Sequence, residues 1–130
     1  MFGKNKNIMV KVPIAPMRFE DGNFSNGDRS WRPETLYNFA KAKEYPTIEI
    51  PLCAIDLGNM PFDCSDLAEF IFQCKRVRSC SLDYPIILDD KGCIADGYHR
   101  VCRAILEGKE TIKAIRLLEM PSPDHIKQNK

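Results

Sequence analysis

The segment Ala95–Ala104, with the sequence ADGYHRVCRA, constrains this chain more than any other part of it. It follows a strand-like run, and it predicts a helix that begins at Tyr98 or His99. The first N–H groups of a helix lack intrahelical partners and carry a partial positive charge, so they attract anions. Gly97 in front of these amides, with the side chains of His99 and Arg100 beside them, indicates a phosphate site. An ordinary strand-to-helix turn with a solvated arginine is the other interpretation, and the local sequence leaves both open.

Composition limits the classes of function. The chain has 130 residues, of which 44% are hydrophobic, which predicts one domain with its own core. Lysine and arginine together number 19 against 18 aspartates and glutamates, so no global field favours a nucleic acid or a membrane. No apolar run reaches the length of a membrane span, and the first residues lack a secretory signal. We therefore expect a cytoplasmic protein with no membrane partner.

The cysteine pattern also favours the cytoplasm. The six cysteines are scattered singly, with no C-x-x-C pair and only two histidines in the chain. This pattern predicts free thiols in a reducing compartment, without a disulfide and without a zinc site.

Residues 1–45 are predicted to be an N-terminal extension packed on the domain that follows. A short strand is expected over Ile8–Ile14 and a loop over Asp21–Asp28, which is rich in glycine and asparagine. At the other end of the chain, residues 121–130 are polar, and we expect a flexible tail there.

The extension also contains a helix signal. Pro33 suits the first helical position, and Glu34 suits the positive end of the helix dipole. With Arg32 as the cap, Trp31 and Leu36 have the spacing of a hydrophobic staple, which we favour over base stacking by the Trp-Arg pair.

The domain over 46–120 is more regular. Thr47–Leu52 alternates like a strand, and a helix capped by Asp63 or Ser65 follows. This helix carries an apolar stripe at helical spacing, formed by Leu67, Phe70, Ile71 and Cys74. Its last turn is basic, with Lys75, Arg76 and Arg78. A solvated helix end that complements the dipole is the interpretation we favour over a nucleic-acid patch.

The last part of the domain predicts a hairpin, a helix and a strand. Pro85–Ala95 is the hairpin, and its turn at Asp89–Gly92 offers Gly92 for a positive φ. Gly108 ends the following helix, and Thr111–Leu118 is the final strand. Strand, helix and strand predict a right-handed βαβ unit. The fold class is α+β, with a small mixed β-sheet packed by helices.

From Thr47 to Leu118 the chain resembles the ParB N-terminal/sulfiredoxin-like superfamily, whose members include ParB-like nuclease domains. The resemblance rests on four stretches in matching order: Ile48–Leu52, Pro85–Asp89, Ile94–Arg100 and Glu110–Ala114. It implies a ParB/sulfiredoxin-like fold and a nucleotide triphosphate, ATP or CTP with Mg²⁺, held at the start of the motif helix. The nucleotide-binding residues would be Gly97, Tyr98, His99 and Arg100.

The departures from this family narrow the function. Tyr98 stands where sulfiredoxins carry their reactive cysteine, and a phenol cannot form the sulfur linkage which that chemistry needs; Cys102 lies about one turn later. The partition proteins have a Gly-Glu-Arg-Arg-x-Arg box, of which only Gly97 and Arg100 match. Because Tyr98 replaces the reactive cysteine, we do not expect sulfinic-acid reduction. Because no helix-turn-helix domain follows, we do not expect recognition of a partition site on DNA.

The leading hypothesis is a nucleotide-binding domain that acts as a phosphotransferase or a nucleotide hydrolase. Phosphoryl transfer needs positioned charge, so carboxylates near the phosphate are the catalytic candidates, namely Asp96 and Asp63. Asp96 could orient a metal ion or accept a hydroxyl proton. Its alternative role is to cap the motif helix.

Two other classes of function stay open. One is a DNA-associated nuclease or a partition or regulatory accessory protein, with phosphate contacts from Lys75, Arg76, Arg78, Arg100 and Arg103. The other is a non-catalytic interaction module in which residues 1–45 contact a protein partner through Trp31, Phe39 and Tyr45.

Overall fold

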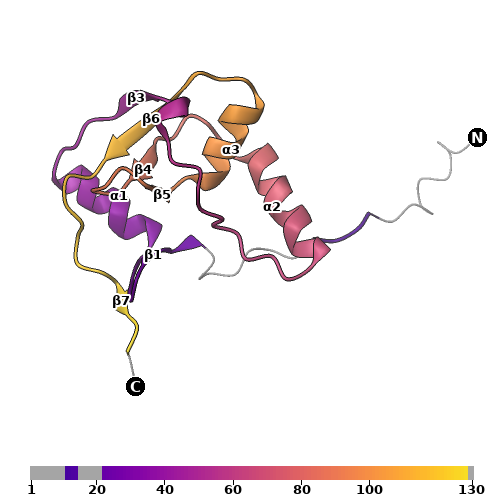
Figure 1. Ribbon diagram of the computed structural model, residues 1–130, viewed down its shortest axis with the longest axis horizontal. Helices are drawn as coiled ribbons and strands as arrows, with labels where there is room; N and C mark the ends of the chain where they lie inside the picture. The colour runs from indigo at the N-terminus through magenta and orange to yellow at the C-terminus, as the bar shows by residue number, and fades with distance from the viewer. Residues whose placement is uncertain (1–10, 15–21, 129–130) are drawn as a thin grey trace, which may run out of the picture.

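A computed structural model describes residues 11–14 and 22–128 of the chain. The fold is α+β, as the sequence predicts, and Figure 1 shows its helices around a central sheet. Its helices are α1 (Pro33–Ala42), α2 (Leu67–Ser79), α3 (Tyr98–Leu106) and the short 3₁₀ helix η4 (Leu52–Ala54). Its strands are β1 (Phe24–Asn26), β2 (Arg29–Trp31), β3 (Ile48–Pro51), β4 (Ile86–Leu88), β5 (Ile94–Asp96), β6 (Thr111–Arg116) and β7 (His125–Ile126). Within the described residues, no helix is both long and apolar enough to span a membrane.

The central sheet is mixed and has the strand order β3-β6-β4-β5. β4 pairs antiparallel with β5 and parallel with β6, while β3 pairs antiparallel with β6. The predicted βαβ unit is therefore wrong, because β5 and β6 are not neighbours and run in opposite directions. The tight turn fixes β5 on one edge of β4, so β6 pairs along the other edge.

The hairpin between β4 and β5 confirms the predicted turn. The N–H of Asp89 donates to the Cys93 carbonyl at 2.8 Å, and Gly92 has φ +88°. The side chain of Asp89, only 3% exposed, accepts the N–H groups of Lys91 and Cys93 at 2.9 and 2.8 Å. These two bonds offset the cost of burying a carboxylate and hold the turn in place.

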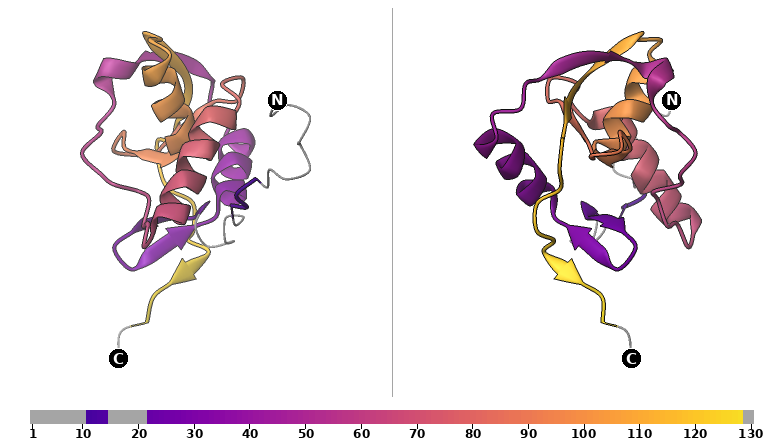
Figure 2. Two further views of the ribbon diagram at one scale, coloured as in Figure 1. Left: turned by 90° about the vertical axis from the view of Figure 1, so that its right-hand side faces the viewer. Right: turned by 60° about the vertical axis from the view of Figure 1, so that its left-hand side comes forward.

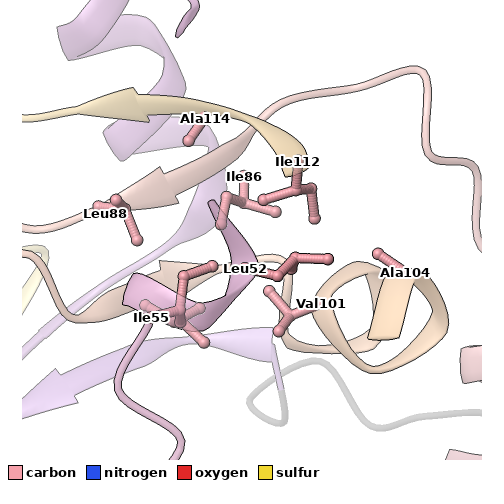
Figure 3. Close-up of a cluster of buried hydrophobic side chains, with 9 residues drawn as sticks. Leu52, Ile55, Ile86, Leu88, Val101, Ala104, Ile112 and Ala114 are labelled. Carbon is pink, nitrogen blue, oxygen red and sulfur yellow. The ribbon is translucent and has the colours of Figure 1, made fainter. Parts of the chain in front are cut away.

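Alternation along β4 divides the core between the two faces of the sheet. Ile86 and Leu88 face α3, whereas Ile87 faces α1. The first cluster, drawn in Figure 3, consists of Leu52, Ile55, Ile86, Leu88, Ile94, Val101, Ala104, Ile112 and Ala114. The second cluster consists of Trp31, Leu36, Ala40, Ile87, Ala95 and Leu117. Helix α1 from the predicted extension thus supplies Leu36 and Ala40 to the second cluster.

Helix α1 starts as predicted, with Arg32 at the N-cap and Pro33 in the first turn. Trp31 and Leu36 are buried in the same cluster, as a hydrophobic staple requires. Helix α3 begins at Tyr98, which is also confirmed. It ends before Gly108, whose φ of +73° suits a glycine after a helix.

Helix α2 differs from its prediction in two respects. Its N-cap is Asp66, whose side chain accepts the N–H of Glu69 at 2.8 Å, and not Asp63 or Ser65. None of its residues is buried: Leu67 is 69% exposed and Phe70 is 51% exposed. The stripe at helical spacing does not reach the core, because α2 packs beside α3 and not on the sheet.

A second small sheet pairs the β1–β2 hairpin with β7 near the C-terminus, in the order β1-β2-β7. Figure 2 shows the yellow β7 beside the indigo β1–β2 hairpin. The predicted loop over Asp21–Asp28 is thus partly wrong, since β1 and the turn at Gly27 occupy it, and the predicted tail contains β7. The strand predicted over Ile8–Ile14 lies partly outside the described residues, and residues 11–14 have no regular structure.

Candidate functional site

Gly97 forms the junction between β5 and α3. It adopts a left-handed conformation, with φ +103°, at the N-cap of α3. A Cβ at this position would lie 2.5 Å from Cγ2 of Ile86 and 2.9 Å from its Cβ. Ile86 is fully buried, so packing inside the protein is sufficient to require glycine here.

Arg100 extends beside the N-cap Gly97 and into a polar network. Its Nη2 donates to the Tyr37 hydroxyl at 2.6 Å, to Oδ2 of Asp96 at 3.2 Å and to the Pro85 carbonyl at 3.3 Å. The Tyr37 hydroxyl lies 3.0 Å from the same Asp96 oxygen and 2.7 Å from the Pro85 carbonyl. The solvated arginine of the local interpretation is wrong: this side chain joins α1, β4, β5 and α3.

Burial strengthens the electrostatic interactions within this network, because water screens its charges less. The side chains of Arg100 and Asp96 are 17% and 22% exposed. Burial, followed by the charge of Asp96, raises the pKa of Tyr37 above its ordinary value, so the phenol stays protonated at neutral pH. Nε of Arg100 is buried without a hydrogen-bond partner among the described residues. Asp96 does not cap α3, and the N-cap Gly97 offers no side chain for that purpose.

His99 is held from two sides. Its Nε2 lies 2.7 Å from Oε1 of Gln73 on α2, and its ring stacks on Phe62 with a centroid distance of 4.7 Å. Burial, followed by the positive charges of Arg76 and Arg100, lowers the pKa of His99 to about 4. The imidazole is therefore neutral at pH 7, with Nε2 donating to the amide oxygen.

The lowered pKa of His99 predicts that this one residue makes the stability of the protein vary with pH. Between about pH 6.5 and pH 4 the unfolded chain binds a proton at His99 and the native chain does not, so the free energy of unfolding falls with falling pH. We expect His99 to contribute about 1–2 kcal/mol of this loss, since solvent reaches part of the ring. In urea unfolding, the free energy of unfolding of the His99→Gln variant should fall less steeply with falling pH than that of the wild type. Wild-type and His99→Gln slopes that coincide would contradict this, and His125→Gln is the control.

Tyr98 faces the core side of the helix start. Its hydroxyl donates to the Ile94 carbonyl at 2.8 Å, and its ring meets Phe62 edge to face at 6.3 Å. The side chain packs against the cluster beneath α3, and burial raises its pKa.

A small pocket of about 90 Å³ opens at the start of α3. Its walls include Asp96, Gly97, Tyr98, His99 and, from α2, Arg76. Three of the four predicted nucleotide-binding residues therefore meet in one place, whereas Arg100 lies outside the lining. Tertiary structure adds Arg76 to the residues that line this pocket.

The two predicted catalytic carboxylates are treated differently by the structure. Asp96 lines the pocket but is bound to Arg100 and Tyr37. Asp63 precedes α2 and is not among the residues that line this pocket. Burial raises the pKa of Cys102, which makes it a poor substitute for a reactive thiolate.

The basic side chains predicted for DNA contact are partly used inside the protein. Arg100 belongs to the network above, and Arg103 pairs with Glu107 at 2.6 Å and donates to the Cys80 carbonyl. All six cysteines are free thiols, and the described residues contain no group of three or more His, Cys, Asp or Glu side chains that could hold a metal ion.

Sequence reasoning missed Tyr37, Gln73 and Phe62. Tyr37 is 63 positions from Arg100, and Gln73 is 26 positions from His99. No local pattern links such residues, because only the packing of α1, of α2 and of the loop before α2 brings them to the start of α3.

Comparisons with protein-family models, with curated proteins and with solved structures find no match to this chain. The resemblance to the ParB/sulfiredoxin-like superfamily therefore stays a prediction.

Proposed function

We propose that this protein binds the phosphate of a nucleotide in the pocket at the start of α3. The observation that carries the proposal is the meeting of Arg76, His99 and the uncapped first turn of α3 around one small hollow. Helix N-termini offer N–H groups and partial positive charge to anions, and arginine adds charge-assisted hydrogen bonds. The pocket volume of about 90 Å³ suits a single phosphoryl group better than a whole nucleotide.

The local electrostatics support an anion. Burial, followed by the positive charges of Arg76 and Arg100, lowers the pKa of His99, so two cations act on the imidazole at the pocket wall. The same two charges would attract a phosphate, and a bound phosphate would in turn favour the protonated imidazole. Binding should therefore raise the pKa of His99 and strengthen as the pH falls.

The family resemblance would make the ligand ATP or CTP. Mg²⁺ would come with the phosphates, since it needs only one or two protein carboxylates. Asp96 is the carboxylate at the pocket, but Arg100 and Tyr37 already bind it, so these residues do not form a ready metal site. The proposal is accordingly one of binding. Phosphoryl transfer and membership of the ParB/sulfiredoxin-like superfamily stay predictions from the sequence.

The test uses tripolyphosphate and the two histidines of the chain, His99 and His125. Tripolyphosphate should raise the pKa of His99, followed by NMR of the imidazole protons, by about one unit or more, and leave His125 unchanged. Arg76→Ala should weaken binding about tenfold or more, as loss of a charge-assisted contact predicts. The control Arg78→Ala removes the same charge from an exposed position of α2 outside the pocket.

Equal losses in Arg76→Ala and Arg78→Ala would reduce the effect to general charge and overturn the proposal. So would a His99 pKa that does not respond to saturating tripolyphosphate.

A further inference from the structure

A larger cavity adjoins the phosphate pocket. Its volume is about 630 Å³, within the range of small-molecule sites. It lies between the β1–β2 hairpin, the loop over 59–61 and the β4–β5 turn, and it shares Asn23, Pro61 and Tyr98 with the phosphate pocket. One ligand can therefore occupy both hollows.

The lining of this cavity is polar but carries no net charge. Asp89 and Lys91 balance each other, in contrast to the arginine-rich surroundings of the phosphate pocket. Three asparagines line it: Asn23, Asn26 and Asn59. Among the described residues none of them makes a side-chain hydrogen bond, and each amide carries both donors and an acceptor.

An aromatic surface completes the cavity. Phe24 lines it and is fixed by stacking on the buried Trp31, with ring centroids 5.7 Å apart. A rigid aromatic ring beside amide groups is the combination that proteins use to stack a nucleobase and to read its edge.

We propose that this cavity holds the ribose and base of the nucleotide, and that Asn26 and Asn59 determine which base is accepted. The inference rests on the proposed function, because the phosphate at α3 places the nucleoside next to the cavity. An amide both donates and accepts, so it distinguishes bases whose edges present opposite patterns.

Calorimetric titration with tripolyphosphate, ATP, CTP, GTP and UTP separates the two proposals. At least one nucleotide should bind about tenfold more tightly than tripolyphosphate and tighter than the other three. The double variant Asn26→Ala/Asn59→Ala should lower that affinity to the level of tripolyphosphate and leave tripolyphosphate itself unchanged. Both residues are exposed, so the variant should fold, and circular dichroism checks this. Asn38→Ala, an exposed amide on α1 away from the cavity, is the matched control.

If all four nucleotides bind no more tightly than tripolyphosphate, the cavity proposal is overturned and the phosphate site stands. If neither nucleotides nor tripolyphosphate bind, both proposals are overturned. A loss in Asn38→Ala equal to that of the double variant would also overturn the role of the cavity amides.

Discussion

Gly97→Ala should destabilise the protein by about 3–5 kcal/mol, enough to unfold many domains of this size. The new Cβ would lie 2.5 Å from Cγ2 of Ile86, a side chain that is fully buried and cannot move aside. The positive φ of +103° adds backbone strain, because L-residues with a Cβ rarely adopt it. Urea unfolding followed by circular dichroism measures the loss.

Gly27→Ala is the matched control for this variant. Gly27 also has a positive φ, of +65°, but a Cβ there would meet nothing within 4 Å. It should cost only about 1 kcal/mol, the backbone part of the effect. Equal losses at the two glycines would show that contact with Ile86 contributes nothing. Because Gly97 has this structural task, its substitution cannot by itself locate a phosphate.

Arg100→Ala should cost about 2–4 kcal/mol of stability. The guanidinium binds Tyr37, Asp96 and the Pro85 carbonyl at once, and its removal leaves the Asp96 carboxylate in a largely buried place without its cation. Urea unfolding at pH 7 gives the stability change.

The control for Arg100→Ala is Arg103→Ala on the same helix. Arg103 forms an i,i+4 pair with Glu107 and donates to the Cys80 carbonyl, but its removal leaves no buried carboxylate without a cation, so the variant should cost less than Arg100→Ala. A larger loss in Arg103→Ala than in Arg100→Ala would contradict the structural role of the network. A Tyr37→Phe/Arg100→Ala cycle should show coupling between the two residues, because the phenol and the guanidinium share one hydrogen bond.

Several features of the fold were determined by the sequence within short stretches. Asp89–Gly92 predicts the turn, Pro33 predicts the start of α1, and Gly108 predicts the end of α3. Each depends on a backbone preference or a hydrogen bond that closes within a few residues, so neighbours along the chain are sufficient to specify it. The start of α3 after Gly97 belongs to the same group.

Tertiary structure alone decided the partners of these residues. Arg100 looks like a ligand-binding side chain in sequence, yet Tyr37 and Asp96 bind it inside the protein. Arg76 looks like part of a basic helix end, yet it lines the pocket at α3. Helical spacing on α2 indicates a core face, but α2 packs beside α3 and stays unburied. Periodicity reports which residues share a face of an element, and only the packing of distant elements decides what that face contacts.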